Sequence, residues 1–177
     1  MEGIIIYRGK YGATKQYATW LGEDLNLPVF ASEEIAMEKI EPYNYLVIGS
    51  SVYIGKLQIR KWLFKNESYL KDKKIFFFQV AASPVKQIEK RTMYNESSIP
   101  AGLINKNSFF FLPGRIKMEN LNWVDRLLLK MGSKLTKDLV EKKNMVTDFD
   151  NVSKESLNEI EAEISAFANI AYPANTV

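Results

Sequence analysis

The segment from Arg8 to Thr14 is the part of the sequence best suited to bind an anion. It reads Arg-Gly-Lys-Tyr-Gly-Ala-Thr and leads from an apolar run directly into a helical pattern. Small residues allow backbone N–H groups to turn toward an anion, and the amino end of the following helix adds partial positive charge. The sequence therefore predicts a phosphate-binding loop made of Gly9, Lys10, Tyr11, Gly12, Ala13 and Thr14.

The alternative interpretation of this loop is purely structural. Gly12 would make only a tight turn, and Thr14 would only cap the helix. The loop does not end in Gly-Lys-Ser/Thr, so it is not a Walker A motif, and it does not have the GxGxxG spacing of a dinucleotide site.

Two further segments have residue types that suit a flat ligand. The first reads Ser50, Ser51, Val52, Tyr53, Ile54 and Gly55, which could present backbone amides and an aromatic face. The alternative for this segment is a polar turn in which Tyr53 is half buried by chance. The second includes Ala82 and Ser83, which are small enough for a ring to approach the backbone.

The chain alternates β-rich runs with helical patterns. The runs cover residues 3–7, 28–30, 45–49, 75–80 and 109–112, and helical spacing is found at residues 14–25, 57–69, 84–94 and 153–171. Most runs are continuously apolar, as is typical of parallel strands buried on both faces. We expect an α/β fold, a doubly wound five-stranded parallel sheet in the order 2-1-3-4-5 with helices on both faces. Ligands of such sheets bind where the strand order reverses, here between the first and third strands.

Composition excludes several classes of chemistry. The 177 residues include no cysteine and no histidine, which excludes disulfides, thiolate nucleophiles, iron–sulfur clusters and Ser-His-Asp triads. Redox chemistry would require an organic cofactor. Because there is no histidine and no carboxylate is predicted to converge on the three ligand segments, the sequence suggests no general acid or base. No metal site is predicted, and any metal would be a hard ion held by oxygen ligands. We expect a single domain over residues 1–172 with a C-terminal tail at 173–177, located in the cytoplasm.

The segment of residues 115–143 is basic, with eight Lys or Arg against four Asp or Glu, a net charge of +4. Within it, residues 121–139 have an apolar helical stripe and a separate row of cations, Arg126, Lys130, Lys134 and Lys137. The favoured interpretation is that the apolar stripe packs on the sheet and the lysines form its solvated face. The alternative is peripheral contact with the inner face of a membrane. Nucleic-acid binding is not expected, because stacking aromatic residues are not interleaved with the cations.

The phosphate loop resembles that of flavodoxins, in which a Gly-x-Thr stretch wraps the phosphate of FMN. Gly12 and Thr14 match that pattern, whereas Ala13 stands where Asn is frequent. The resemblance implies a flavodoxin-like domain with non-covalent FMN, the phosphate at residues 9–14 and the ring between the second and third segments.

A closer resemblance is to the flavodoxin-type, quinone-dependent protoporphyrinogen oxidase family. It is carried by Val47-Ile48-Gly49-Ser50-Ser51, by the aromatic strand that ends in Gly114-Arg115, and by Trp123-Val124-Asp125-Arg126. This implies an FMN-dependent oxidoreductase that transfers electrons from an organic donor such as protoporphyrinogen to a quinone. The alternative is a flavodoxin-type electron carrier that acts between protein partners, without an organic substrate. The oligomeric state is not predicted.

Overall fold

The computed structural model describes residues 1–81, 88–136 and 139–171. Five parallel strands form the central sheet in the order β2-β1-β3-β5-β6. They are β1 (Gly3–Arg8), β2 (Val29–Ala31), β3 (Tyr45–Tyr53), β5 (Lys74–Ala81) and β6 (Ser108–Pro113). Numbered among these five alone, the order is 2-1-3-4-5, so the predicted fold class and strand order are confirmed.

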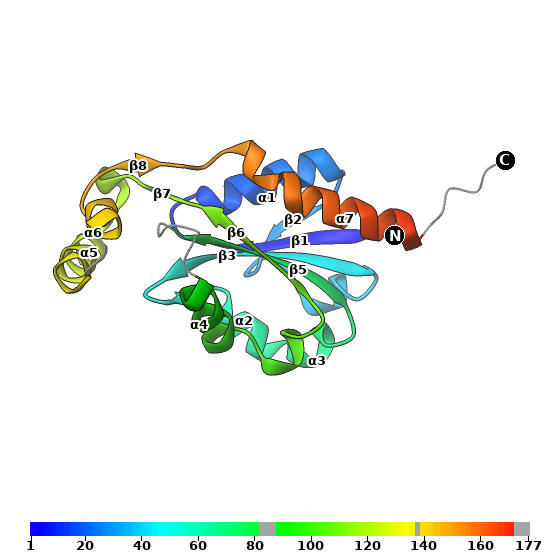
Figure 1. Ribbon diagram of the computed structural model, residues 1–177. Helices are drawn as coiled ribbons and strands as arrows, with labels where there is room; N and C mark the ends of the chain where they lie inside the picture. Colours follow the sequence, from blue (N-terminus) through cyan, green and yellow to red (C-terminus); the bar gives the residue numbers. More distant parts are fainter. Residues whose placement is uncertain (82–87, 137–138, 172–177) are drawn as a thin grey trace.

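Helices cover both faces of this sheet (Figure 1). One face carries α1 (Ala13–Leu25) and α7 (Asn158–Ala171), the latter preceded by the short 3-10 helix η4 (Lys154–Leu157). The other face carries α2 (Arg60–Lys65), α3 (Glu67–Leu70) and α4 (Ile88–Ser98). Three further 3-10 turns lie in the connections, η1 (Met37–Lys39), η2 (Ala101–Leu103) and η3 (Met118–Asn120).

The apolar runs form strands because both of their faces are buried. Ile5, Phe76 and Phe78 belong to the core cluster under α1 and α7. Their chain neighbours Ile4 and Phe77 belong to the cluster on the opposite face. Successive side chains of a strand point to opposite faces, so a continuous apolar run is what two covered faces require.

The predicted helix over residues 57–69 is divided in the structure. Lys56–Leu57 forms the short strand β4, which pairs antiparallel with the end of β3. Two short helices follow, α2 and α3, joined at Asn66. The Asn66 side chain donates a hydrogen bond to the Trp62 carbonyl oxygen at 2.8 Å, so it competes with regular helical bonding at this point.

The favoured interpretation of residues 121–139 is wrong about the apolar stripe, although Arg126, Lys130 and Lys134 are solvent-exposed as expected. The segment forms α5 (Trp123–Leu135), and α6 (Leu139–Asn144) follows it. These helices lie beyond the carboxyl ends of the strands, next to the antiparallel pair β7 (Arg115–Ile116) and β8 (Phe149–Asp150). We call α5 and α6 the helical arm. The apolar stripe does not pack on the sheet, since Leu135 is 83% exposed and Met131 55%. Lys137 lies outside the described residues.

Candidate functional site

A cavity of about 420 Å³ lies where the strand order reverses, between the ends of β1 and β3 and the helical arm. Its volume falls within the roughly 300–1,000 Å³ typical of small-molecule and cofactor sites. Nine of the sequence-predicted residues line it: Lys10, Tyr11, Ala13, Thr14, Ser51, Val52, Tyr53, Ile54 and Gly55. The structure therefore brings the first and second predicted segments together on one cavity.

The loop that follows β1 is built around the amino end of α1. Gly12 is the N-cap residue with a φ of 85°, a left-handed conformation that glycine adopts without strain. A Cβ on Gly9 would lie 2.6 Å from the Thr14 hydroxyl oxygen, so only glycine lets the loop approach Thr14 this closely. Gly9 and Gly12 shape the loop and are not among the residues that line the cavity.

Thr14 has a buried hydroxyl and lies beside this cavity. The residue is 1% exposed and lines the cavity wall in the first turn of α1. Its Oγ1 atom has no hydrogen-bond partner among the described residues. The backbone N–H groups of a first helical turn also have no intrahelical acceptor. A buried donor without a partner beside such a helix end fits an anionic ligand.

The second segment is strand and hairpin rather than a loop. The sequence placed its loop after Gly49, whereas β3 continues to Tyr53 and turns back through Ile54 and Gly55 into β4. Both turn residues have positive φ, 48° and 71°. The continuation is stabilised by the buried Ser50, whose Oγ accepts a hydrogen bond from the Ile59 N–H at 3.1 Å. Ser50 thus has a structural contact and is not among the residues that line the cavity.

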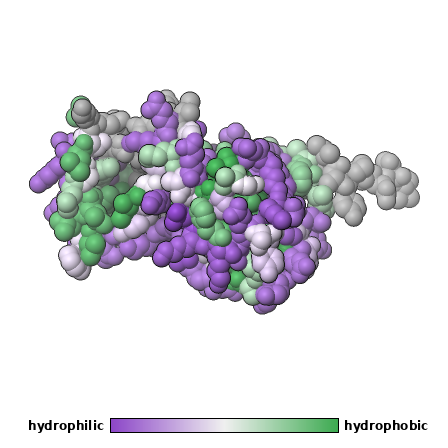
Figure 2. All heavy atoms as spheres, turned by 90° about the horizontal axis from the view of Figure 1, so that it is seen from below, coloured by the Kyte–Doolittle hydropathy of each residue, from purple (hydrophilic) through white to green (hydrophobic). Residues whose placement is uncertain are grey.

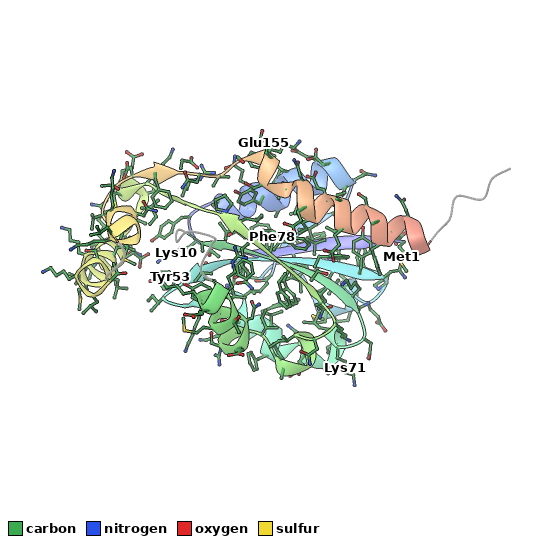
Figure 3. All side chains as sticks on the ribbon, in the orientation of Figure 1. Met1, Lys10, Tyr53, Lys71, Phe78 and Glu155 are labelled. Carbon is green, nitrogen blue, oxygen red and sulfur yellow. The ribbon has the colours of Figure 1, made fainter. Side chains whose placement is uncertain are left out.

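One carboxylate converges on both segments. Asp125 in the first turn of α5 is 4% exposed and lines the cavity. Its Oδ1 accepts a hydrogen bond from the Tyr53 hydroxyl at 2.6 Å, and its Oδ2 accepts one from Lys10 Nζ at 2.7 Å. The Tyr11 hydroxyl also donates to Oδ2. Figure 3 shows Lys10 and Tyr53 close together at the end of the sheet that faces the helical arm.

The contacts around Asp125 form a compact charged cluster. Lys10 Nζ lies 5.3 Å from the Tyr11 ring centroid and 5.1 Å from that of Tyr53, within range of a cation–π contact with each. The Asn122 side chain accepts a hydrogen bond from the Asp125 N–H at 2.8 Å, which makes Asn122 the capping residue of α5. The cluster therefore ties the start of the helical arm to both predicted ligand segments.

These contacts change the pKa of each member. Burial alone would raise the pKa of Asp125, but the hydrogen bonds from Lys10, Tyr11 and Tyr53 outweigh it and hold that pKa below its ordinary value. The hydrogen bond to Asp125 raises the pKa of Lys10. Burial, and then the same carboxylate, raises the pKa of Tyr11. Near neutral pH the cluster is a lysinium–carboxylate pair flanked by two neutral phenols.

The expectation that no carboxylate would converge on the ligand segments is wrong. The sequence marks Asp125 only as part of the Trp-Val-Asp-Arg segment, because its position in space depends on the direction in which the arm leaves the sheet. One signal pointed to it, since it is the single acidic residue of α5 in an otherwise basic amphipathic helix. Residues missed at the cavity also include Gln58, Val80, Tyr94, Arg115, Leu128 and Met145.

The third segment is not tested by the structure, because Ala82 and Ser83 lie outside the described residues. Among the residues that are described, no group of three or more acidic side chains is placed to hold a metal ion. In the same parts of the chain, no helix has the length and apolar character needed to cross a bilayer.

Comparison with known proteins identifies the family. The sequence model of the flavodoxin domain family matches residues 4–143, which is most of the chain. The chain belongs to the flavodoxin domain family. The matched residues of this flavodoxin domain include the phosphate-loop segment, the hairpin and Asp125.

Individual relatives of this flavodoxin domain are distant. An uncharacterised protein of Methanocaldococcus jannaschii is 26% identical over 85 residues, which are 48% of this chain and 57% of that protein. The matched segment thus spans little more than half of that relative. A flavodoxin from the domain Archaea is 18% identical, with a TM-score of 0.39 over 68% of this chain and 88% of the other. A flavoprotein from Lactobacillus acidophilus, solved in complex with FMN, is 15% identical, with a TM-score of 0.44 over 63% and 91%.

Proposed function

We propose that the cavity binds FMN, with the phosphate at the amino end of α1. The observation that carries this proposal is the buried, unpartnered hydroxyl of Thr14, a residue that lies in the first turn of α1 and lines the cavity. A phosphate oxygen would accept a hydrogen bond from this hydroxyl and from the free N–H groups of the turn. Membership of the flavodoxin domain family supports the same choice of ligand.

The remaining cavity residues suit the rest of such a ligand. Residues 51–55 would hold the flavin ring, since they combine backbone amides with the side chain of Tyr53. The hydrogen bond from the Tyr53 hydroxyl to Asp125 fixes the position of its ring in advance. Leu128 lines the cavity from the side of the helical arm and adds an apolar surface there. Bound FMN would supply one- and two-electron redox chemistry, which the side chains of this cysteine-free chain do not provide.

We propose electron transfer between protein partners as the role of the FMN-bound protein. The family match supports this carrier function, because it is to a flavodoxin domain and implies no particular organic substrate. Ile54 at the hairpin tip lines the cavity and is 67% exposed, so a ligand bound against it would lie near the surface.

A second candidate is the quinone-dependent oxidation of an organic donor such as protoporphyrinogen. One observation favours it. Asp125, within the Trp-Val-Asp-Arg segment on which the resemblance to that oxidase family rests, is a buried carboxylate on the cavity wall. Such a group could hold an N–H donor of an organic substrate.

Two measurements test these proposals in turn. Purified protein mixed with FMN and then dialysed should retain a flavin absorption spectrum, and a protein that stays colourless would contradict FMN binding. The loaded protein should then be supplied with protoporphyrinogen and a quinone. Sustained turnover would favour the oxidase over the carrier, and the absence of turnover with both ubiquinone- and menaquinone-type acceptors would remove the second candidate.

A further inference from the structure

The helical arm presents its apolar face to solvent. Trp123, Leu127, Met131 and Leu135 follow one another at four-residue steps along α5 and are 76%, 50%, 55% and 83% exposed. Leu139, at the start of α6, is 80% exposed. Figure 2 shows hydrophobic residues gathered at the left end of the molecule, where Figure 1 places the arm. We call these five residues the apolar strip.

Unlike a core helix, α5 exposes its large apolar side chains and buries polar ones. The buried side chains of α5 are Asp125 and Ser133, both polar. Asp125 is held by Lys10, Tyr11 and Tyr53, so the side of the helix that carries Asp125 is fixed to the body of the protein, and Leu128 and Leu129 line the cavity beside it. A surface helix of a globular protein normally buries its apolar side. Here the body's contacts with Asp125 direct the apolar strip outward, where it needs a partner.

Cations border the apolar strip. Arg126, Lys130 and Lys134 form a parallel row at four-residue steps, and all three are exposed. The one acidic residue of α5, Asp125, is buried and paired. The exposed surface of α5 therefore combines large apolar side chains with positive charge alone. Trp123, at one end of the strip, is a residue type enriched where membranes meet water.

We propose that the helical arm docks on the surface of an anionic lipid bilayer, with the apolar strip in the interface and the cation row against the headgroups. This combination of an apolar face and a basic border is what interfacial helices use. A second copy of this chain fits the strip less well, because a twofold contact would bring two cation rows together. The proposal goes beyond FMN binding and does not depend on it.

Co-sedimentation with lipid vesicles tests the proposal. The full chain should bind vesicles of phosphatidylcholine containing one-third phosphatidylglycerol and bind pure phosphatidylcholine vesicles far more weakly. Leu135→Glu and the double variant Lys130→Gln/Lys134→Gln should each weaken binding by about tenfold. The matched control is Tyr69→Glu on α3, which replaces a 61% exposed side chain outside the arm and should bind like the wild-type protein.

A second readout places the strip itself in the lipid. Brominated phosphatidylcholine in the vesicles should quench tryptophan emission in the wild-type protein, and Trp123→Phe should remove most of that quenching. Failure of the wild-type protein to bind the anionic vesicles would overturn the proposal, as would binding that both arm variants leave unchanged. A dimer that Leu135→Glu dissociates, without vesicle binding, would instead assign the strip to self-association. FMN loading should be equal in all of these variants, which separates this result from the proposed cofactor.

Discussion

The Thr14 hydroxyl is a buried donor without a protein acceptor in the described structure, and burying such a group costs about 1–3 kcal/mol. Thr14→Val keeps the shape and removes the donor. We therefore expect opposite effects on two quantities, unchanged or slightly higher stability of the ligand-free protein and about tenfold weaker FMN binding. Thr14→Ser, which keeps the hydroxyl, is the control. A titration followed by flavin fluorescence would refute the role of Thr14 if the valine and serine variants bound FMN equally.

Asp125 is expected to contribute to stability in a defined pH range. Its pKa is lowered in the folded protein, so its contribution is present above the unfolded value of about 3.9 and is lost as pH falls through the folded value. Asp125→Asn should cost about 2 kcal/mol at pH 7, because it weakens three hydrogen bonds to a charged group. Chemical unfolding from about pH 7 to pH 3 should show the difference between wild type and variant shrinking at the acid end.

A surface pair supplies the control for that experiment. Asp24 accepts a hydrogen bond from Lys154 at 2.7 Å, but Lys154 is about half exposed. Pairs of this kind contribute little, so Asp24→Asn should change stability by less than about 1 kcal/mol. If Asp125→Asn were as mild as Asp24→Asn at pH 7, the buried cluster would not hold the arm to the body.

At the level of the elements, the start of α1 depends on one backbone conformation. Gly12 has a φ of 85°, and a Cβ there would meet no atom within 4 Å. Gly12→Ala would therefore impose only the conformational cost of a left-handed residue, about 1–2 kcal/mol. Gly102→Ala, at a glycine without positive φ, should be much milder. Thermal unfolding compares the two, and equal losses would show that the left-handed turn does not matter.

The strands and the first helix could be read from the sequence because local pattern decides them. Continuous apolar runs flanked by helices leave few arrangements other than a doubly wound sheet, and the reversal of strand order then locates the cavity. The hairpin was missed, because Ser50, Ser51, Tyr53 and Gly55 have the composition of a loop. What extends β3 to Tyr53 is tertiary, namely the pairing with β4 and the buried hydrogen bond to Ser50.

At the level of the whole molecule, the helical arm is separate from the core. Periodicity correctly indicated an amphipathic helix near residues 121–139, but it carries no information on which side faces the body. The side of α5 that faces the body is set by Asp125. Its hydrogen-bond partners are separated from it by 72 to 115 positions in the chain. Contacts of such sequence separation cannot be predicted from one segment, and for this reason the carboxylate of the site was missed.

Because the arm is separate from the core, the same Leu→Ala substitution should reduce stability by different amounts in the two places. Leu63 in α2 is fully buried, and Leu63→Ala should destabilise the protein by about 2–5 kcal/mol. Leu135 in the arm is 83% exposed, and Leu135→Ala should change stability by no more than about 0.5 kcal/mol. Denaturant unfolding measures both. A large loss for Leu135→Ala would mean that the arm is packed against the body in solution.

The affinity of the wild-type protein for FMN, compared with its affinity for riboflavin, is the decisive test of the proposed phosphate site. Riboflavin has the same ring and lacks only the phosphate, so the ratio isolates the anion site at Thr14 and the amino end of α1. We expect FMN to bind at least about a hundredfold more tightly, equivalent to two charge-assisted hydrogen bonds. Equal affinity for the two flavins, or no binding of either, would contradict it.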